Sequence, residues 1–327
     1  MPAAAISVTV HASQFPAAVR GQLLESLRSR RVNHKFHYDS AKQTLKWLAV
    51  HETCSPARTD ADCLSIYETA FKATAETLPK SPVHLISIGC GGGQKDAILA
   101  RQLATTRAVH YTPTDVSMPM VIVAAQAVQA SAPVILRPPA VFDLAEIQDL
   151  SEVISEQPGE TRLVACFGMV PNFEPGLFFP SVTSLLRAGD YFLMSANLAP
   201  GSDYSAGVRQ ILPQYDNEPT REWLLTFLLD LGVNREAGQL LFSIEPCPHG
   251  SGLQRVEANF AFSTPTTIHV ESESFQFKAG ESIRLFFSYR NTPQSVRTLL
   301  KTQGVTVSKE WISGSGEEGV FLCQKAG

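Results

Sequence analysis

The stretch VHLISIGCGGGQKDAILA, residues 83–100, decides the fold of this 327-residue chain. Its first six residues form a short apolar run, which predicts a buried strand. A glycine-rich segment follows at 89–93, and residues 96–104 then favour a helix. A glycine-rich turn lets the backbone approach a ligand closely, and the amides at the start of the next helix attract polar or negative groups. The stretch therefore predicts a ligand site, although a tight turn without a ligand would carry the same pattern.

Strands and helices alternate on both sides of this stretch. Upstream, residues 14–50 and 60–77 have helical spacing, with a break at 55–59. Downstream, the pattern predicts strands and helices in turn at 108–112, 119–130, 135–142, 144–156, 162–167, 178–186 and 190–196. Strands that alternate with helices at this spacing indicate a parallel, doubly wound sheet.

The regular alternation of strands and helices ends after Asn197. Residues 221–231 predict a helix. Three segments then alternate apolar and polar residues as antiparallel strands do, at 254–263, 267–275 and 282–289. This part of the chain is therefore expected to be an insertion or a cap. Beyond it, a helix at 292–303 and a hairpin of 305–313 with 319–324 would close the large sheet.

Composition and charge exclude several classes of protein. With 44% hydrophobic and 18% charged residues, the chain has the make-up of an ordinary folded protein. A net charge of -4 gives no basic field for nucleic acid, and no apolar run reaches the roughly 18 residues of a membrane span. The first ten residues lack a secretory signal, so the sequence predicts a cytoplasmic protein. The oligomeric state stays open.

Single residues outside the glycine turn support weaker predictions. The six cysteines contain no CxxC pair, so we expect buried free thiols, no disulfide framework and no bound metal. His34 and His37 either lie on a helix surface or line the entrance to a substrate site. Trp223, Leu224 and Phe227 recur at helical spacing, which predicts packing in a core.

Two aspartates follow predicted strands and bear on the choice of cofactor. Asp115 follows the second strand, where a carboxylate can accept hydrogen bonds from both ribose hydroxyls of a nucleotide. Asp143 follows the third strand and could accept from an adenine amino group, or could instead cap the next helix. A nicotinamide dinucleotide usually needs a cleaner GxGxxG turn, whereas Gln94 fills the sixth position of this one. S-adenosylmethionine (SAM) is therefore favoured over a nicotinamide cofactor.

Three longer motifs follow one another along the chain: GCGGGQK at 89–95, YTPTDVS at 111–117 and GMVPNFEP at 168–175. Shorter ones stand at 38–39, 56–59, 215–216, 255–257 and 280–284. None is specific by itself. Together, in order and spacing, they resemble the histidine-specific N-alpha-methyltransferase family of ergothioneine biosynthesis over nearly the whole chain.

The resemblance implies an α/β fold of the class I methyltransferase type, with a doubly wound and mostly parallel sheet. A Rossmann-like domain would comprise residues 63–199 and 291–327. A second, smaller α+β domain would bind the substrate and comprise residues 1–62 and 200–290. This division agrees with the end of the strand–helix alternation after Asn197.

The resemblance also implies roles for individual residues. SAM would be held by the glycine turn and the residues around it, namely Gly89, Gly91, Gly93, Lys95, Asp115, Asp143 and Leu144. Asn172 and Tyr215 would hold the amino-acid end of a small-molecule substrate and orient its amine, so they are the expected catalytic residues. The rest of the substrate pocket would be formed by Tyr38, Ser55, Phe286 and Ser288.

Two of these pocket positions depart from the family. Ser55 stands where the family has a tyrosine, and Phe286 where it has a glutamate; an alignment shifted by one residue would place Leu285 or Phe287 there. A glutamate can bind an imidazole N–H and a phenylalanine cannot. We therefore expect an amine substrate other than histidine, with an apolar or aromatic side chain. Methyl transfer to an oxygen or to a protein side chain, and a SAM-binding protein without activity, are the alternatives.

Overall fold

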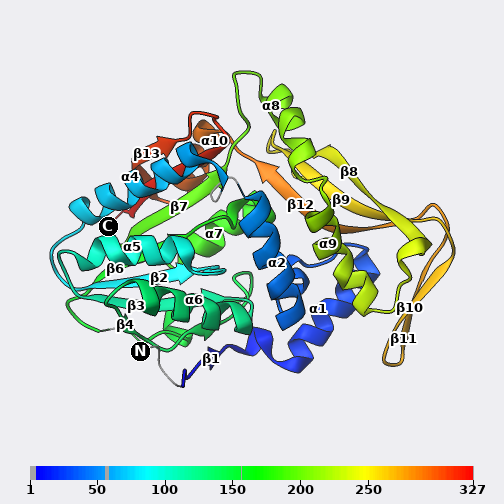
Figure 1. The fold of residues 1–327 in the computed structure, drawn as a ribbon, viewed down its shortest axis with the longest axis horizontal. Helices are drawn as coiled ribbons and strands as arrows, with labels where there is room; N and C mark the ends of the chain where they lie inside the picture. Colours follow the sequence, from blue (N-terminus) through cyan, green and yellow to red (C-terminus); the bar gives the residue numbers. More distant parts are fainter. Residues whose placement is uncertain (1–4, 56–58, 156, 327) are drawn as a thin grey trace.

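The computed structural model describes residues 5–55, 59–155 and 157–326. Within these residues the larger sheet has nine strands (Figure 1). They are β1 (Thr9–Val10), β2 (Val83–Ile88), β3 (Val109–Asp115), β4 (Ile135–Leu136), β5 (Ala140–Val141), β6 (Thr161–Cys166), β7 (Tyr191–Asn197), β13 (Val305–Ile312) and β14 (Glu318–Lys325). Their order is β1-β5-β3-β2-β6-β7-β14-β13, with β4 beside β3. Only β14 pairs antiparallel, with β7 and β13, which confirms the predicted doubly wound, mostly parallel sheet.

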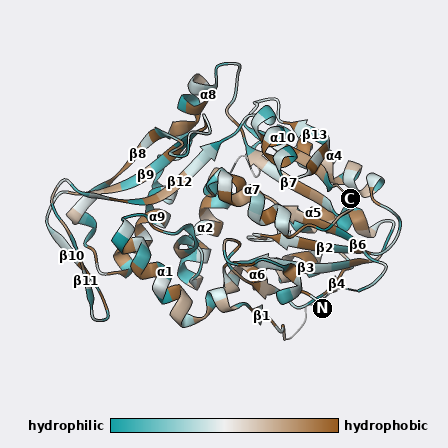
Figure 2. Ribbon diagram, turned by 180° about the vertical axis from the view of Figure 1, so that it is seen from behind, coloured by the Kyte–Doolittle hydropathy of each residue, from teal (hydrophilic) through white to brown (hydrophobic). Residues whose placement is uncertain are grey.

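The central strand β2 is buried along its whole length. The sheet is covered by α4 (Ala61–Thr77), α5 (Gln94–Ala104), α6 (Met118–Ser131), α7 (Pro175–Ser184) and α10 (Pro293–Thr302). Val83 and Leu85 belong to one hydrophobic core with α4 and α5, whereas Ile86 and Ile88 belong to another with α7 and α10. Alternate residues of β2 thus face opposite helical layers, and apolar residues run along the strands between these layers (Figure 2).

The strand order reverses at β2, since β3 and β5 lie on one side of it and β6 and β7 on the other. In doubly wound sheets, ligands bind outside the carboxyl ends of the strands at such a point. The glycine turn at 89–93 directly follows β2. It therefore lies where this topology places a ligand.

A second, antiparallel sheet has the order β12-β9-β8. The elements of this half are α1 (Pro16–Ser29), α2 (Ala41–Cys54), α8 (Tyr204–Ile211), α9 (Glu218–Asp230), β8 (Gly238–Pro246), β9 (Gln254–Phe262), β10 (Thr266–Val270), β11 (Glu273–Phe277) and β12 (Ser282–Arg290). Leu27 and Phe36 share one core with Trp223, Leu224 and Phe227 of α9, which confirms the core packing predicted for these three residues. The N-terminal segment and the later segment are thus joined through one hydrophobic cluster.

The helix predicted at 144–156 is not formed. The chain makes a turn after Asp143 and then a short 3-10 helix, Leu150–Glu152; residue 156 lies outside the described chain. The side chain of Asp143 accepts from the backbone N–H of Ala145, and Asp149 caps the 3-10 helix with Glu152 in a capping box. Such local bonds between side chain and backbone compete with a continuous helix.

Two further predictions differ from the structure in detail, and two strands were missed. The segment 267–275, predicted as one strand, is the antiparallel hairpin β10–β11, which turns at Glu271 with a φ of 52°. The strand predicted at 135–142 is divided into β4 and β5, because Pro138 and Pro139 have no N–H to donate to a sheet. The strands β1 and β8 were not predicted.

The remaining predictions concern single residues and the membrane. Four of the six cysteines are buried free thiols, while Cys54 and Cys90 are partly exposed. His37 is fully buried rather than on a helix surface, and its Nε2 lies 2.8 Å from the carbonyl oxygen of Leu285. Across the described ranges, no helix is both long and apolar enough to cross a membrane.

Candidate active site

A cavity of about 670 Å³ lies between the two halves of the molecule and takes its walls from both. Its volume is in the range usual for small-molecule sites. Most of the predicted site residues line it: Gly89, Gly91, Lys95, Asp115, Asp143, Leu144, Tyr38, Ser55, Asn172, Tyr215, Phe286 and Ser288. Gly93 does not line it. Ser55 does, but most of the segment 56–59 quoted from the sequence lies outside the described residues.

The glycine turn adopts a backbone that only glycine adopts without strain. Gly89, Gly91 and Gly93 have φ values of 65°, 51° and 73°. A Cβ on Gly89 would lie 1.9 Å from the sulfur of Met169, and a Cβ on Gly93 would lie 2.6 Å from the Cα of Ala124 in α6. Gly89 thus lets the side chain of Met169 pack against the turn, whereas Gly93 lets α5 and α6 approach each other.

Asp115 ends β3 beside this turn. Its Oδ2 accepts from the backbone N–H of Gly91 (3.1 Å), and its Oδ1 accepts from that of Ser117 (3.0 Å). Burial raises the pKa of Asp115 to about 6, although these backbone donors favour the ionised form. A carboxylate has about four acceptor positions. Acceptor capacity therefore remains for hydroxyl donors in the cavity.

Asp143 and Leu144 lie beside one another at the same edge of the sheet. The Oδ1 of Asp143 accepts from Ala145 N–H at 3.0 Å, and Gln22 of α1 donates to its Oδ2 at 3.4 Å. The alternative that Asp143 caps the next helix is not correct, because no helix follows it directly, and this oxygen closes a turn instead. Asp143 belongs to the cavity wall, where the buried Leu144 adds an apolar surface.

Lys95 lies in the first turn of α5 and contacts Tyr67, a residue that the sequence did not single out. Its Nζ donates to the hydroxyl of Tyr67 at 2.7 Å and lies 4.2 Å from the centre of that ring. The hydroxyl of Tyr67 in turn donates to Glu318 of β14. Tyr67 follows the apolar spacing of an amphipathic helix, so no local pattern distinguishes it from a core residue.

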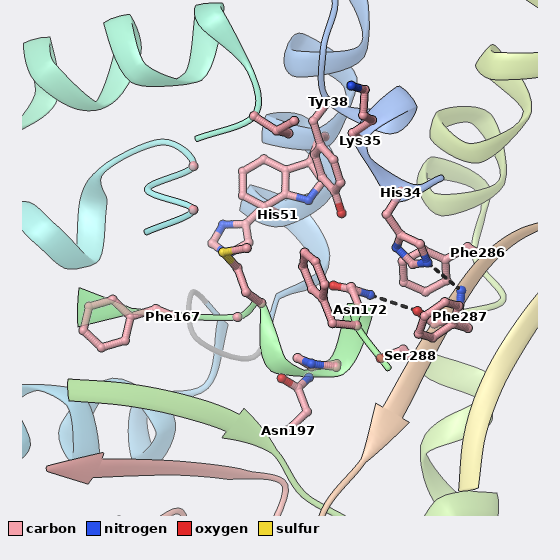
Figure 3. A pocket seen from close by; sticks show the side chains of 18 of the residues that line it. His34, Lys35, Tyr38, His51, Phe167, Asn172, Asn197, Phe286, Phe287 and Ser288 are labelled. Carbon is pink, nitrogen blue, oxygen red and sulfur yellow. Dashed lines mark hydrogen bonds between the residues drawn. The ribbon is translucent and has the colours of Figure 1, made fainter. Parts of the chain in front are cut away.

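Asn172, Tyr215 and Ser288 meet at β12. Asn172 ends a short 3-10 helix after β6, and its Nδ2 donates to the carbonyl oxygen of Phe287 at 2.9 Å (Figure 3). The hydroxyls of Tyr215 and Ser288 are 2.6 Å apart. The structure therefore brings together three polar residues that are distant in sequence and predicted for the substrate site.

Aromatic rings line the cavity next to these polar groups. The ring of Phe286 lies 5.1 Å from that of His34, 5.7 Å from Trp223 and 6.1 Å from Tyr215, measured between ring centres. Phe287 also lines the cavity, whereas Leu285 does not, which removes one of the alignment alternatives. The side chain at this end of the cavity is thus apolar for either remaining alignment.

His34 and Tyr38 complete the wall from the N-terminal segment. The backbone N–H of Phe287 donates to Nε2 of His34 at 3.4 Å, and burial lowers the pKa of His34 well below its usual value (Figure 3). His34 is therefore a neutral imidazole that lines the cavity and does not lie on a helix surface. Burial raises the pKa of Tyr38, which keeps its phenol protonated. Within the described part of the chain, no three His, Cys, Asp or Glu side chains are grouped to hold a metal.

Comparisons with solved structures reveal methyltransferases of low sequence identity. CcbJ of Streptomyces caelestis is 14% identical with a TM-score of 0.41, over 80% of this chain and 90% of that chain. The 1,6-didemethyltoxoflavin-N1-methyltransferase of Burkholderia thailandensis is 13% identical with a TM-score of 0.42, over 88% and 89%. The CurJ carbon methyltransferase is 12% identical with a TM-score of 0.48, over 94% and 64%. No curated protein gave a significant match.

The family comparison covers almost the entire chain. The profile described as histidine-specific, SAM-dependent methyltransferase matches residues 19–325. This match spans the glycine turn, both aspartates and the residues that meet at β12. The protein is thus a SAM-dependent methyltransferase with a Rossmann-like fold, and the chain belongs to the histidine-specific, SAM-dependent methyltransferase family.

Proposed function

We propose that this enzyme N-methylates the α-amine of a free amino acid whose side chain is apolar or aromatic. One observation carries the proposal: polar groups suited to an amino-acid backbone meet at β12, while the wall beyond them is aromatic. Asn172, Tyr215 and Ser288 supply the polar groups. Phe286 supplies the aromatic wall where the family has a glutamate.

The residues around the glycine turn fit SAM. Gly89 and Gly91 bring the backbone of the turn to the cavity wall, where it can approach a ligand closely, and Asp115 keeps acceptor capacity for a ribose diol. Asp143 with Leu144 would hold the adenine, and Lys95 would attract the carboxylate of the methionyl part. When bound, SAM supplies an electrophilic methyl group on a sulfonium sulfur. Substrate binding we assign to residues 1–62 and 200–290, because these segments share one core, and SAM binding to residues 63–199 and 291–327.

Asn172 is suited to orient the amine. Its Nδ2 is engaged by the carbonyl of Phe287, so its Oδ1 is the atom left to accept an N–H from a substrate. An amine held in this way attacks the methyl carbon with its lone pair, and the breaking C–S bond leaves its electrons on sulfur. The amine must be neutral to attack, so its proton passes to a basic group or to water beforehand. Rate acceleration comes mainly from the alignment of the two reactants.

The direct test is methyl transfer from labelled SAM to a panel of acceptors. We expect label on the nitrogen of free L-amino acids with aromatic or large apolar side chains. Label only on hydroxylated compounds or on protein would replace the proposal with an oxygen- or protein-directed methyltransferase. Tight binding of S-adenosylhomocysteine (SAH) without any transfer across the panel would support an inactive SAM-binding protein.

Histidine is expected to be a poor substrate. An imidazole placed against Phe286 buries a polar N–H without a partner, which should lower kcat/KM relative to L-phenylalanine by roughly tenfold or more. Initial rates with the two amino acids measure the ratio. As a control, Phe286→Glu should shift the ratio toward histidine, since a carboxylate can accept from the imidazole. Efficient methylation of L-histidine by the wild-type enzyme would refute this preference.

SAH affinity is expected to depend on pH through Asp115. Hydroxyl donors bind the ionised carboxylate better, so affinity should be full above the pKa of about 6 and fall as the pH drops through it. Below that point the association constant should decrease by up to about tenfold per pH unit. Calorimetric titrations between pH 5 and 8 measure the profile. The Asp115→Asn variant should bind more weakly with a flat profile; a decline of equal steepness in that variant would assign the titration to another group.

A further inference from the structure

Arg290, the last residue of β12, is a buried cation in the cavity wall. Arg290 is only 4% exposed to solvent, and it lines the cavity. Its Nη2 donates to the hydroxyl of Tyr215 at 2.8 Å, and its Nη1 reaches the carbonyl oxygen of Leu198 at 3.5 Å. Its Nε is buried and has no hydrogen-bond partner among the residues that the structure describes. Among the described residues, the hydrogen-bond partners of its side chain are thus neutral groups.

A comparison with Arg255, another buried arginine in the same half, shows that Arg290 has no counter-ion among the described residues. Arg255 is 5% exposed and forms ion pairs with Glu174 at 2.6 Å and with Glu257 at 2.5 Å. No carboxylate of the described chain forms such a pair with Arg290. A buried charge without a counter-ion is destabilising. Its retention beside a ligand cavity suggests that the counter-ion comes with a ligand.

We propose that Arg290 is the electrostatic anchor for the carboxylate of the substrate. The oxygen of Tyr215 accepts from Arg290 and lies 2.6 Å from the oxygen of Ser288. If Ser288 donates to Tyr215, the phenolic proton of Tyr215 is left to donate outward. The neighbouring guanidinium polarises that proton and strengthens its bond to an anion. The identity of this anion as an amino-acid carboxylate rests on the proposed function.

The same charge discriminates against amines that lack a carboxylate. Asp115 and Asp143 lie on the SAM side of the cavity, and Glu174 in its wall is paired with Arg255, whereas Arg290 lies with the substrate residues on β12. An amine without an acid group would leave the guanidinium buried and unpaired. It would also bring its own positive charge, before proton loss, toward another cation. The enzyme should therefore select amino acids over their decarboxylated amines.

The binding test uses probes that separate the two ends of an amino acid. SAH-saturated enzyme is titrated calorimetrically with 3-phenylpropanoate and indole-3-propanoate, which have no amine, and with 2-phenylethylamine, which has no carboxylate. Arg290→Met should weaken the better of the two acids by about 10- to 100-fold. Binding of 2-phenylethylamine should stay equal or improve. Arg290→Lys should restore part of the acid affinity. As a matched control, Arg297→Met on α10, at an exposed ion pair with Glu310, should change neither.

Thermal stability gives a readout that does not depend on turnover. Methionine replaces an unpaired buried charge with an apolar side chain of similar length, so Arg290→Met should melt no lower than the wild type without ligand. 3-Phenylpropanoate or indole-3-propanoate, at a concentration that saturates the wild type, should raise the melting temperature of SAH-bound wild type more than that of the variant. If Arg290→Met fails to fold, Arg290→Lys serves instead. Lysine keeps the positive charge, so this variant should bind the acids more tightly than 2-phenylethylamine, and equal binding would contradict the anchor.

The outcomes separate the anchor from the proposed function. The anchor is overturned if the wild type binds neither of the two acids. It is also overturned if wild type and Arg290→Met bind the acids equally well. Methylation of 2-phenylethylamine as fast as of L-phenylalanine also overturns it, but leaves amine methylation intact. Conversely, acid binding that depends on Arg290, without methylation of any amine, supports the anchor and refutes the proposed function.

Discussion

Replacing Asn172 by alanine is expected to lower kcat/KM for amine methylation on the order of 100-fold, because the amine loses the group that aligns it with the methyl carbon. Affinity for SAH should stay nearly constant. The basis is the position of Asn172, whose Nδ2 is fixed to β12 through the carbonyl of Phe287 while its Oδ1 remains for the substrate. An interaction that acts mainly in the transition state lowers kcat together with kcat/KM.

Steady-state rates with the fastest amino acid of the acceptor panel, together with calorimetric SAH binding, measure this effect. Asn259→Ala on β9, which loses only a bond to Glu257 outside the cavity, is the matched control and should keep near wild-type kinetics. Full turnover by Asn172→Ala would remove it from the reaction. A collapse of SAH binding would instead assign it to the SAM half of the site, and a large loss of thermal stability would indicate that it mainly ties the 3-10 helix to β12.

The parts of the fold that the sequence predicts well are those with a strong local pattern. The run 83–88 is β2 residue for residue, because a continuous apolar run bounded by glycine has few other structures available. The prediction of a helix at 144–156 was wrong because Asp143 and Asp149 each bond to nearby backbone. The spacing of apolar residues does not reveal such competition. The strand β1 is two residues long and depends on pairing with β5, which no local pattern encodes.

The residues of the candidate site likewise fall into those that the sequence predicted and those that it did not. Asp115 was predicted from its place after a strand beside a glycine turn, which is a rule of topology. Tyr67 and Arg290 were not, because their importance depends on partners far away in the sequence. For His34 the sequence left two alternatives, a helix surface and the entrance to a substrate site, and the structure places it in the cavity wall. Arg290 is one polar residue at the end of an alternating strand. Only the structure shows that it donates to Tyr215 and forms no ion pair with a carboxylate of the described residues. Charge compensation is a property of three-dimensional neighbours, and a linear pattern does not report it.

Gly93 contributes to the site through stability alone, so its replacement by alanine should have a large effect on folding. A left-handed backbone costs a non-glycine residue about 1–2 kcal/mol. The added Cβ would also lie 2.6 Å from the Cα of Ala124 and 2.9 Å from its carbonyl oxygen. These atoms belong to the backbone of a buried helix, so relief requires a shift of α6 and not of a side chain, and overpacking of this kind costs about 1–3 kcal/mol more.

The expected loss in unfolding free energy is therefore about 2–5 kcal/mol, a large part of the usual stability of a protein. Gly189→Ala is the matched control, because its φ of 86° imposes the same strain while its Cβ would meet nothing within 4 Å. Urea unfolding of both variants isolates the packing term as the difference between them. Equal losses would mean that α5 and α6 can separate at no cost. A Gly93→Ala protein that is less stable yet binds SAH normally once folded would show that Gly93 supports the turn from behind, as its absence from the cavity wall predicts.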